Sequence, residues 1–150
     1  MPSLTIRPFQ LADHDDWYEL WRGYQSFYNT DISAETSRVT WQRLLDEREP
    51  MNGALAVADE GAVGIVHFIQ HRSCWTIGDY LYLQDLFVAP GVRGQGVGRA
   101  LIEHVYGQAQ QRNCSRVYWL THETNRDAMV LYDRIADRPG FVQYRKVFSK

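Results

Sequence analysis

Hydrophobic and polar residues alternate in several short stretches of the chain, as expected for strands with one buried face. Residues 4–8 place Leu4 and Ile6 on one face and end in a proline, which suits an edge strand because proline has no N–H to donate. Residues 80–88 are apolar on both faces, which predicts a central, buried strand. The predicted strands cover residues 4–8, 54–59, 63–70, 80–88, 116–121 and 141–148.

Apolar residues recur three and four positions apart between these strands, which predicts helices. Asp13 or Asp15 can cap the first helix, which carries an aromatic stripe down to Tyr28. The third helix follows a glycine-rich turn at residues 90–98 and runs to about Arg112. The other predicted helices cover residues 34–47 and about 125–136.

The order of these elements predicts a mixed α/β fold in one domain, residues 1–150. Residues 54–70 form a predicted hairpin, so most of the central sheet is expected to be antiparallel. Residues 80–121 form a strand–helix–strand unit, whose two strands are expected to be parallel. Helices are expected on both faces of the sheet.

Composition narrows the classes of function. The chain has 16 Lys and Arg against 18 Asp and Glu, so it lacks the basic excess of a general nucleic-acid binder, and no such partner is predicted. No apolar run is long enough to span a membrane, and no secretory signal opens the sequence. Its two cysteines lie far apart without a CxxC spacing, which indicates reduced thiols and a cytoplasmic location.

The glycine-rich turn lies between a strand and a helix, where unpaired N–H groups suit a phosphate. The dinucleotide fingerprint fails because Arg99 stands in place of its third glycine. The P-loop pattern fails because Val97, not lysine, follows Gly96. The pattern R-x-x-G-x-G does fit, with Arg93, Gly96 and Gly98. A turn that serves only chain geometry is the alternative.

Two blocks carry a family resemblance. Residues 82–88, Y-L-Q-D-L-F-V, followed by R-G-Q-G-V-G, resemble the acetyl-CoA motif of the GNAT superfamily of N-acetyltransferases. Residues 125–132, N-R-D-A-M-V-L-Y, resemble the family's N-x-x-A-x-x-L-Y helix. The opening T-I-R-P-F is similar to its first strand. The resemblance follows the whole chain and is closest to the polyamine and histone acetyltransferase branch.

The resemblance implies a transferase that moves the acetyl group of acetyl-CoA to a primary amine. A polyamine-like, amino-sugar or lysine-bearing acceptor stays open, as do other acyl-CoA donors, and a homodimer is expected. Backbone N–H groups of the turn would bind the pyrophosphate, and the end of the strand would pair with the pantetheine arm. The cofactor residues so implied are Phe87, Val88, Arg93, Gly94, Gln95, Gly96, Val97, Gly98, Arg99 and Asn125, of which Asn125 also suits a helix cap.

The resemblance assigns Tyr132 the role of the acid that protonates the departing thiolate, which suits a phenol because its pKa is close to that of a thiol. A core position on an amphipathic helix is the alternative for Tyr132. The general base is less defined, because Gln84 stands where relatives commonly carry glutamate. Glu123 is the candidate base, with His122 or a water chain as alternatives.

The acceptor site is expected beside the first two helices, where the family builds its acceptor pocket. Asp31, Glu35 and Glu123 are carboxylates that could attract an ammonium group, and Asp85 is a further substrate-binding candidate. Aromatic faces suit the same group, and the residues that could line the pocket are Trp17, Trp21, Tyr24 and Tyr28, of which Trp21 and Tyr28 are preferred. The alternative for each aromatic residue is the hydrophobic core. No metal is predicted, since His67 and His71 lie about 13 Å apart on one strand.

Two rival functions remain at this point. An acyl-CoA-binding sensor without turnover is favoured by Gln84 and opposed by Tyr132. A purely structural domain requires both motif blocks to be accidental.

Overall fold

The computed structural model describes residues 3–149, which fall into two compact units. The first unit ends at Trp119 and the second begins at Leu120. The first unit is built on a five-stranded sheet in the order β1-β2-β3-β4-β5. All neighbours pair antiparallel except β4 and β5, which are parallel. The strands are β1 (Leu4–Pro8), β2 (Met51–Ala58), β3 (Gly61–His71), β4 (Tyr80–Val88) and β5 (Arg116–Tyr118).

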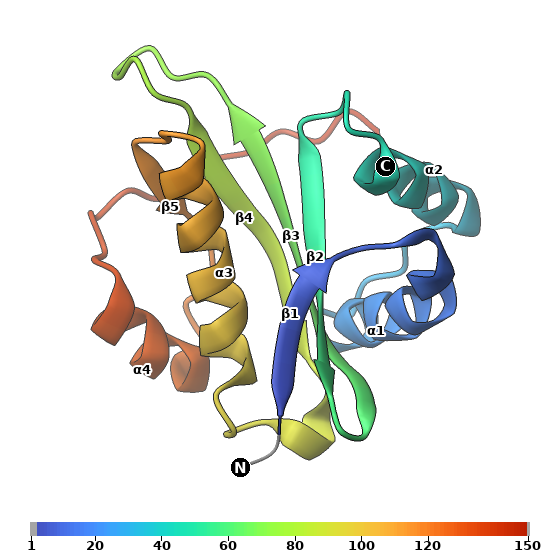
Figure 1. Cartoon of the computed structure of the whole chain (residues 1–150). Coiled ribbons are helices and arrows are strands. Elements are labelled where there is room, and N and C mark those ends of the chain that lie inside the picture. The colour runs from blue at the N-terminus through green and yellow to red at the C-terminus, as the bar shows by residue number, and fades with distance from the viewer. Residues whose placement is uncertain (1–2, 150) are drawn as a thin grey trace. The chain divides into compact units, whose positions relative to one another are not determined.

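Helices cover both faces of this sheet (Figure 1). Helices α1 (His14–Phe27) and α2 (Ala34–Leu45) pack on one face, and α3 (Val97–Gln111) packs on β3 and β4 from the other. Short 3-10 turns, η1 (Leu11–Asp13) and η2 (Pro90–Val92), precede α1 and α3. The predicted mixed α/β fold, with an antiparallel majority and a parallel β4–α3–β5 unit, is confirmed.

Asp13 stands at the predicted cap position of α1, but its carboxylate is used differently. It accepts two hydrogen bonds from the Arg7 guanidinium, at 2.7 and 2.9 Å, and one from the Gln10 N–H at 2.8 Å. It makes no side-chain bond to α1. The Arg7 hydrogen bonds hold the pKa of Asp13 below its usual range. The pair therefore fixes the link from β1 to α1.

A β-bulge interrupts the pairing of β3 with β4. His67 lies opposite Asp85 while Phe68 lies opposite Leu83, so Gln84 is the extra residue. Strict alternation would put Tyr82 and Asp85 on opposite faces, but the bulge brings both to the face that carries α1. Gln84 itself is exposed.

The second unit contains one helix in its described residues, α4 (Arg126–Ile135). The strand predicted at 141–148 is wrong, because residues 137–149 are neither helical nor extended in a sheet. β5 also ends at Tyr118 instead of residue 121. An alternating pattern forms a strand only where a neighbour accepts its main-chain hydrogen bonds, and no strand among residues 3–149 pairs with residues 141–148. Over residues 3–149, no helix has both the length and the apolar character needed to cross a bilayer.

Candidate active site

The glycine-rich turn has a backbone that only glycine adopts readily. Gly94 and Gly96 have φ angles of +83° and +84°, in the left-handed region, and Gly96 directly precedes α3. A Cβ on either residue would meet no other atom within 4 Å, so the requirement for glycine is conformational and does not come from crowding. The glycines predicted from the motif therefore shape the turn.

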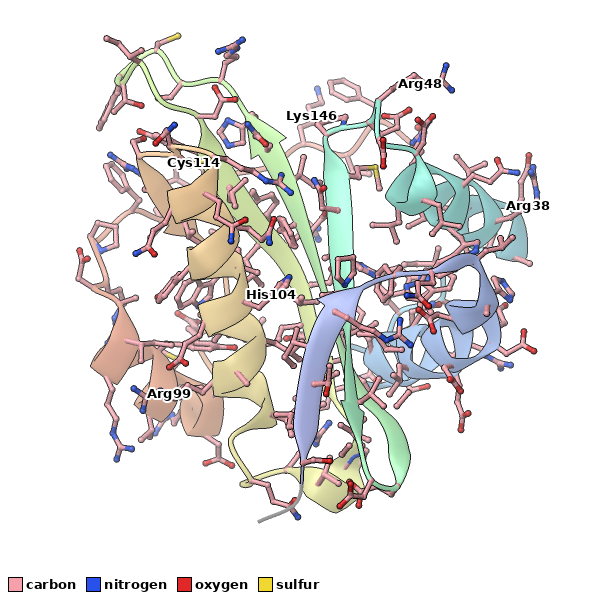
Figure 2. The ribbon with its side chains drawn as sticks, in the orientation of Figure 1. Arg38, Arg48, Arg99, His104, Cys114 and Lys146 are labelled. Carbon is pink, nitrogen blue, oxygen red and sulfur yellow. The ribbon has the colours of Figure 1, made fainter. Side chains whose placement is uncertain are left out.

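The turn presents a row of free main-chain donors. Among the described residues, none accepts a hydrogen bond from the N–H groups of Gly94 through Arg99. These groups lie at the positive end of α3, which makes them a ready anion site. Figure 2 shows Arg99 at the surface in the first turn of α3, where its Nε contacts Glu103 at 2.8 Å. This arrangement can hold a diphosphate.

The edge of β4 that faces β5 is open over its second half. β5 pairs with Tyr80–Tyr82, so within the described five-stranded sheet no strand pairs with residues 83–88 on that side. Because the Ala89 N–H donates to the Val63 carbonyl, the alternation of the ladder turns the main-chain groups of Phe87 toward β3. Those of Val88 and Leu86 face the open edge. Leu86 was missed by the sequence analysis, since the register of a sheet cannot be read from the motif.

Arg93 closes the end of this edge. Its Nε donates to the Val88 carbonyl at 3.0 Å, and its guanidinium lies 5.2 and 5.4 Å from the ring centres of Phe27 and Phe87. Arg93 is therefore fixed between α1 and β4, and the Val88 N–H remains available at the edge.

Asp85 supplies a nearly buried carboxylate three residues before Val88. Its side chain is 11% exposed, and its Oδ2 lies 2.9 Å from His67 Nδ1. The Trp17 indole N–H in turn lies 2.9 Å from His67 Nε2. Tyr24 on α1 also interacts with the Asp85 carboxylate. Asp85 and Tyr24 were both candidates for the acceptor site in the sequence, whereas His67 had been considered only as a metal ligand and its contact with Asp85 was not foreseen.

Three phenols surround this carboxylate from two elements. Burial raises the pKa of Tyr24, and the charge and hydrogen-bonding of Asp85 raise it further. Burial and then the charge of Asp85 likewise raise the pKa values of Tyr28 and Tyr82. All three are thus neutral hydroxyls at physiological pH, and Asp85 is the negative charge among them. Such a site attracts a cation.

The two preferred aromatic candidates for the acceptor site occupy different places. Tyr28 lies just after α1 and is 42% exposed, 4.8 Å from Tyr24 between ring centres. Trp21 is 5% exposed, stacks on Trp17 and Tyr24, and donates its N–H to the Ser37 hydroxyl at 3.1 Å. Trp21 is therefore part of the core beneath the phenols, and Tyr28 is the one that can touch a ligand.

The remaining candidates lie in the second unit. Tyr132 is a half-buried residue in the last turns of α4. Asn125 stands at the N-cap of α4, but its Nδ2 donates to the Thr121 hydroxyl at 3.2 Å and its side chain makes no capping bond. Glu123 is exposed in the preceding turn.

The surface of α1 carries a hollow apart from these residues. The hollow is open, has a volume of about 470 Å³ and is lined by Asp15, Tyr18, Glu19, Arg22, Gly23 and Ser26, none of them a predicted site residue. Among residues 3–149, no three His, Cys, Asp or Glu side chains converge as a metal site would require. His67 and His71 do share one face of β3, as predicted, and His71 Nε2 contacts the Tyr118 hydroxyl at 2.7 Å.

Comparison with known proteins identifies the family. The model of the acetyltransferase (GNAT) family matches residues 14–136, most of the chain. The chain belongs to the GNAT acetyltransferase family. This confirms the resemblance carried by the glycine turn and the 125–132 block, and makes the protein an acyl-CoA-dependent N-acetyltransferase.

Relatives of this GNAT enzyme include proteins that act on small amines. It is 33% identical to a D-amino-acid N-acetyltransferase of Saccharomyces cerevisiae over 145 residues, which cover 95% of this chain and 90% of the relative. It is 38% identical to a thialysine N-epsilon-acetyltransferase of Mus musculus, over 97% of this chain and 93% of the relative. A solved structure of a probable acetyltransferase matches with a TM-score of 0.85 at 26% identity, over 97% and 99% of the two chains.

Proposed function

We propose that this enzyme transfers the acetyl group of acetyl-CoA to the primary amine of a small, amino-acid-like molecule. The observation that carries the proposal is the layout of β4. One strand supplies a shielded carboxylate, Asp85, and three residues later an open main-chain edge at Val88 that leads into the turn of free N–H groups. The carboxylate that would pair with an ammonium and the main-chain groups that would bind the acetyl-CoA arm therefore lie on the same strand.

The acceptor is an ammonium that enters beside the phenols. Its positive charge pairs with Asp85, and the hydroxyls of Tyr24, Tyr28 and Tyr82 exclude water around the pair. The names of the two relatives, which act on D-amino acids and on thialysine, support an amino-acid-like acceptor over an amino sugar or a protein lysine.

The cofactor lies along β4 and ends at α3. The pantetheine arm adds to the open edge through the main chain of Leu86 and Val88, and the Val88 N–H polarises the thioester carbonyl. The N–H groups of Gly94 through Arg99 hold the pyrophosphate, and the Arg99 guanidinium adds positive charge. Phe87 contributes its ring beneath Arg93. Asn125, at the N-cap of α4, is the last residue that we assign to cofactor binding.

The reaction needs three proton transfers. The ammonium first loses a proton, for which Glu123 is the proposed acceptor on the way to solvent. The neutral amine attacks the thioester carbonyl, the C–N bond forms and the C–S bond breaks. Tyr132 protonates the departing sulfur and regains a proton from the nitrogen of the new amide. The products are the N-acetyl amine, free CoA and one released proton.

Release of CoA from acetyl-CoA, followed with a thiol reagent, tests the proposal. The acceptor panel contains D- and L-amino acids, thialysine, polyamines, aminoglycosides and a lysine peptide. Tyr132→Phe is expected to lower kcat about 100-fold or more while the affinity for CoA stays within about twofold. Tyr144→Phe is the matched control, since Tyr144 is a 94% exposed tyrosine in the same unit.

Amine-dependent release with D-amino acids or thialysine, lost in Tyr132→Phe and kept in Tyr144→Phe, supports the proposal. CoA binding without release on any amine would contradict it and favour the sensor considered in the sequence analysis. The homodimer, the single domain and the cytoplasmic location stay predictions, which size-exclusion chromatography, proteolysis and cell fractionation test separately.

A further inference from the structure

Asp85 is the end of a buried chain of hydrogen bonds that begins on α1. Trp17 is fully buried, with its indole Nε1 2.9 Å from His67 Nε2. His67 is 4% exposed, and its Nδ1 is 2.9 Å from Asp85 Oδ2. The three residues come from α1, β3 and β4. We call them the Trp17–His67–Asp85 chain.

The chemistry of the three groups fixes where the protons are. An indole nitrogen can only donate, so His67 Nε2 must accept from Trp17 and carries no hydrogen. The single ring hydrogen of His67 is then on Nδ1 and is donated to the Asp85 carboxylate. A second proton on His67 would point at the Trp17 N–H, which is itself a donor. Trp17 thus holds His67 in one neutral tautomer.

We propose that His67 is a positioning residue for the acetyl transfer, locked by Trp17 so that it orients Asp85 and keeps that carboxylate negatively charged. The inference rests on the proposed function, in which Asp85 pairs with the acceptor ammonium. A protonated His67 would pair with Asp85 itself and cancel the charge that the acceptor needs. The lock by Trp17 prevents this competition.

The groups facing His67 agree with this role. Asp85 faces it from β4 and lies directly opposite in the register, with Tyr82 further along the same face. On α1, the rings of Trp17 and Trp21 contact the His67 ring, and Tyr24 stacks on Trp21. Phe9, in the link before α1, also contacts the His67 ring. The residue opposite on β2 is Gly53, which has no side chain to titrate. His14 lies on the far side of Trp17, with ring centres 6.0 Å apart. Asp85 is the one charged contact of His67 that these described elements provide.

The test combines nitrogen NMR of the histidine rings with the pH dependence of kcat/KM for the amine. Wild-type His67 is expected to show the Nδ1–H tautomer, with Nε2 accepting from Trp17. Trp17→Phe frees Nε2, so His67 should gain a proton as pH falls, and the acid limb of kcat/KM should move up by about one pH unit. Trp41→Phe is the matched control, because it also removes a buried indole that packs on Trp17, 4.9 Å between ring centres.

Substitutions of His67 itself separate positioning from packing. His67→Leu removes the donor to Asp85, which favours the neutral acid over the carboxylate, and should raise KM for the amine at least tenfold with an acid limb shifted like that of Trp17→Phe. His67→Asn keeps a donor at the position of Nδ1 and should restore most of the wild-type profile. A merely structural role would not distinguish the two variants in this way.

Each result has one meaning. The Nε2–H tautomer in the wild type, or profiles of Trp17→Phe and His67→Leu that match Trp41→Phe, would overturn the inference and leave the proposed function in place. A wild type that transfers acetyl groups to no amine would overturn both. An active enzyme in which Asp85→Asn costs no activity would refute the role of Asp85, and the inference with it.

Discussion

The two faces of the β3–β4 pair differ in the side chains that they bury, one being apolar and the other containing buried polar groups. The face under α3 is apolar, with Val66, Phe68, Leu81 and Leu83 against the helix. Its titratable neighbour, His104, packs over the Phe68 ring between α3 and the sheet (Figure 2), and burial and then Arg112 lower its pKa. The face under α1 instead buries His67 and Asp85 among aromatic rings.

The difference begins at the bulge. Up to Leu83 the strand places its aliphatic residues under α3, and from Asp85 on its alternation is shifted by one residue. Because of the shift, Tyr82 before the bulge and Asp85 after it both face α1, while Leu81 and Leu83 remain under α3. Each buried polar side-chain atom described on the α1 face has a partner, which is the condition under which such a polar cluster is tolerated. The α3 face is therefore an apolar packing surface, whereas the α1 face also buries the polar groups to which we assign the acceptor site.

A truncation on the α3 face tests the structural half of this contrast. Leu81 is fully buried, so Leu81→Ala should lower the free energy of unfolding by about 3 kcal/mol through lost burial and a residual cavity. Urea denaturation gives the loss. Its kcat/KM per folded molecule should stay within about threefold of the wild type. A large loss of activity at unchanged stability would contradict the division between the faces.

An isosteric change on the α1 face should do the reverse. Asp85→Asn removes the negative charge but keeps an oxygen that accepts from His67, so kcat/KM for the amine should fall about 100-fold, equivalent to about 2.7 kcal/mol. The free energy of unfolding should change by less than about 1 kcal/mol. Steady-state kinetics and urea denaturation on the same preparation provide both values. Equal effects on stability and on activity would make Asp85 a structural residue.

The glycine turn can be tested with a matched pair of glycines. Gly96→Ala forces a side chain into a left-handed backbone, which should cost about 1–2 kcal/mol of stability and weaken CoA binding about tenfold. Gly107 lies inside α3 with no atom within 4 Å of a new Cβ, so Gly107→Ala should stabilise by about 0.5–1 kcal/mol and leave CoA binding unchanged. Thermal unfolding and calorimetric titration with CoA measure these effects. Unweakened CoA binding by Gly96→Ala would refute the assignment of the phosphate turn.

Substitution of Tyr24 should have the smallest effect, a change in the pH dependence of the free energy of unfolding above pH 10. Its folded pKa lies above the unfolded value of about 10, so its stabilisation is complete below pH 10 and is lost as pH rises further. Tyr24→Phe should reduce the slope of stability against pH above 10 by at most about 1.4 kcal/mol per pH unit, the value for one proton. Chemical denaturation at pH 9 to 11 measures the slope. An unchanged slope would mean that Tyr24 is not shielded.

The local pattern of the sequence was enough for most of the elements. β4 has the predicted bounds 80–88, and α2 and α3 begin where predicted, because period and glycine placement are local properties. The shift at Gln84 was not predictable, since the run of alternating residues around it hides an inserted residue. For the same reason Tyr82 was not associated with Asp85.

The candidate site was predicted only where a motif marks it. The turn glycines and Asp85 lie within the 82–98 block, whereas His67 and Trp17 belong to no motif and are fifty residues apart. Trp21 and Tyr28 share one helical stripe, and only the packing of α2 on Trp21 separates core from surface. The failed strand at 141–148 is a similar case, because a partner strand is not a property of the segment itself.

The open edge of β4 has a consequence for how the protein behaves before it meets its cosubstrate. Unpaired main-chain groups along a hydrophobic strand form a template for another chain, which in concentrated solution favours association. An occupant that adds to that edge also binds the folded state alone, and at a hundred times its dissociation constant it contributes about 2.7 kcal/mol of stability. The cellular supply of CoA would then set the lifetime of the enzyme as well as its rate.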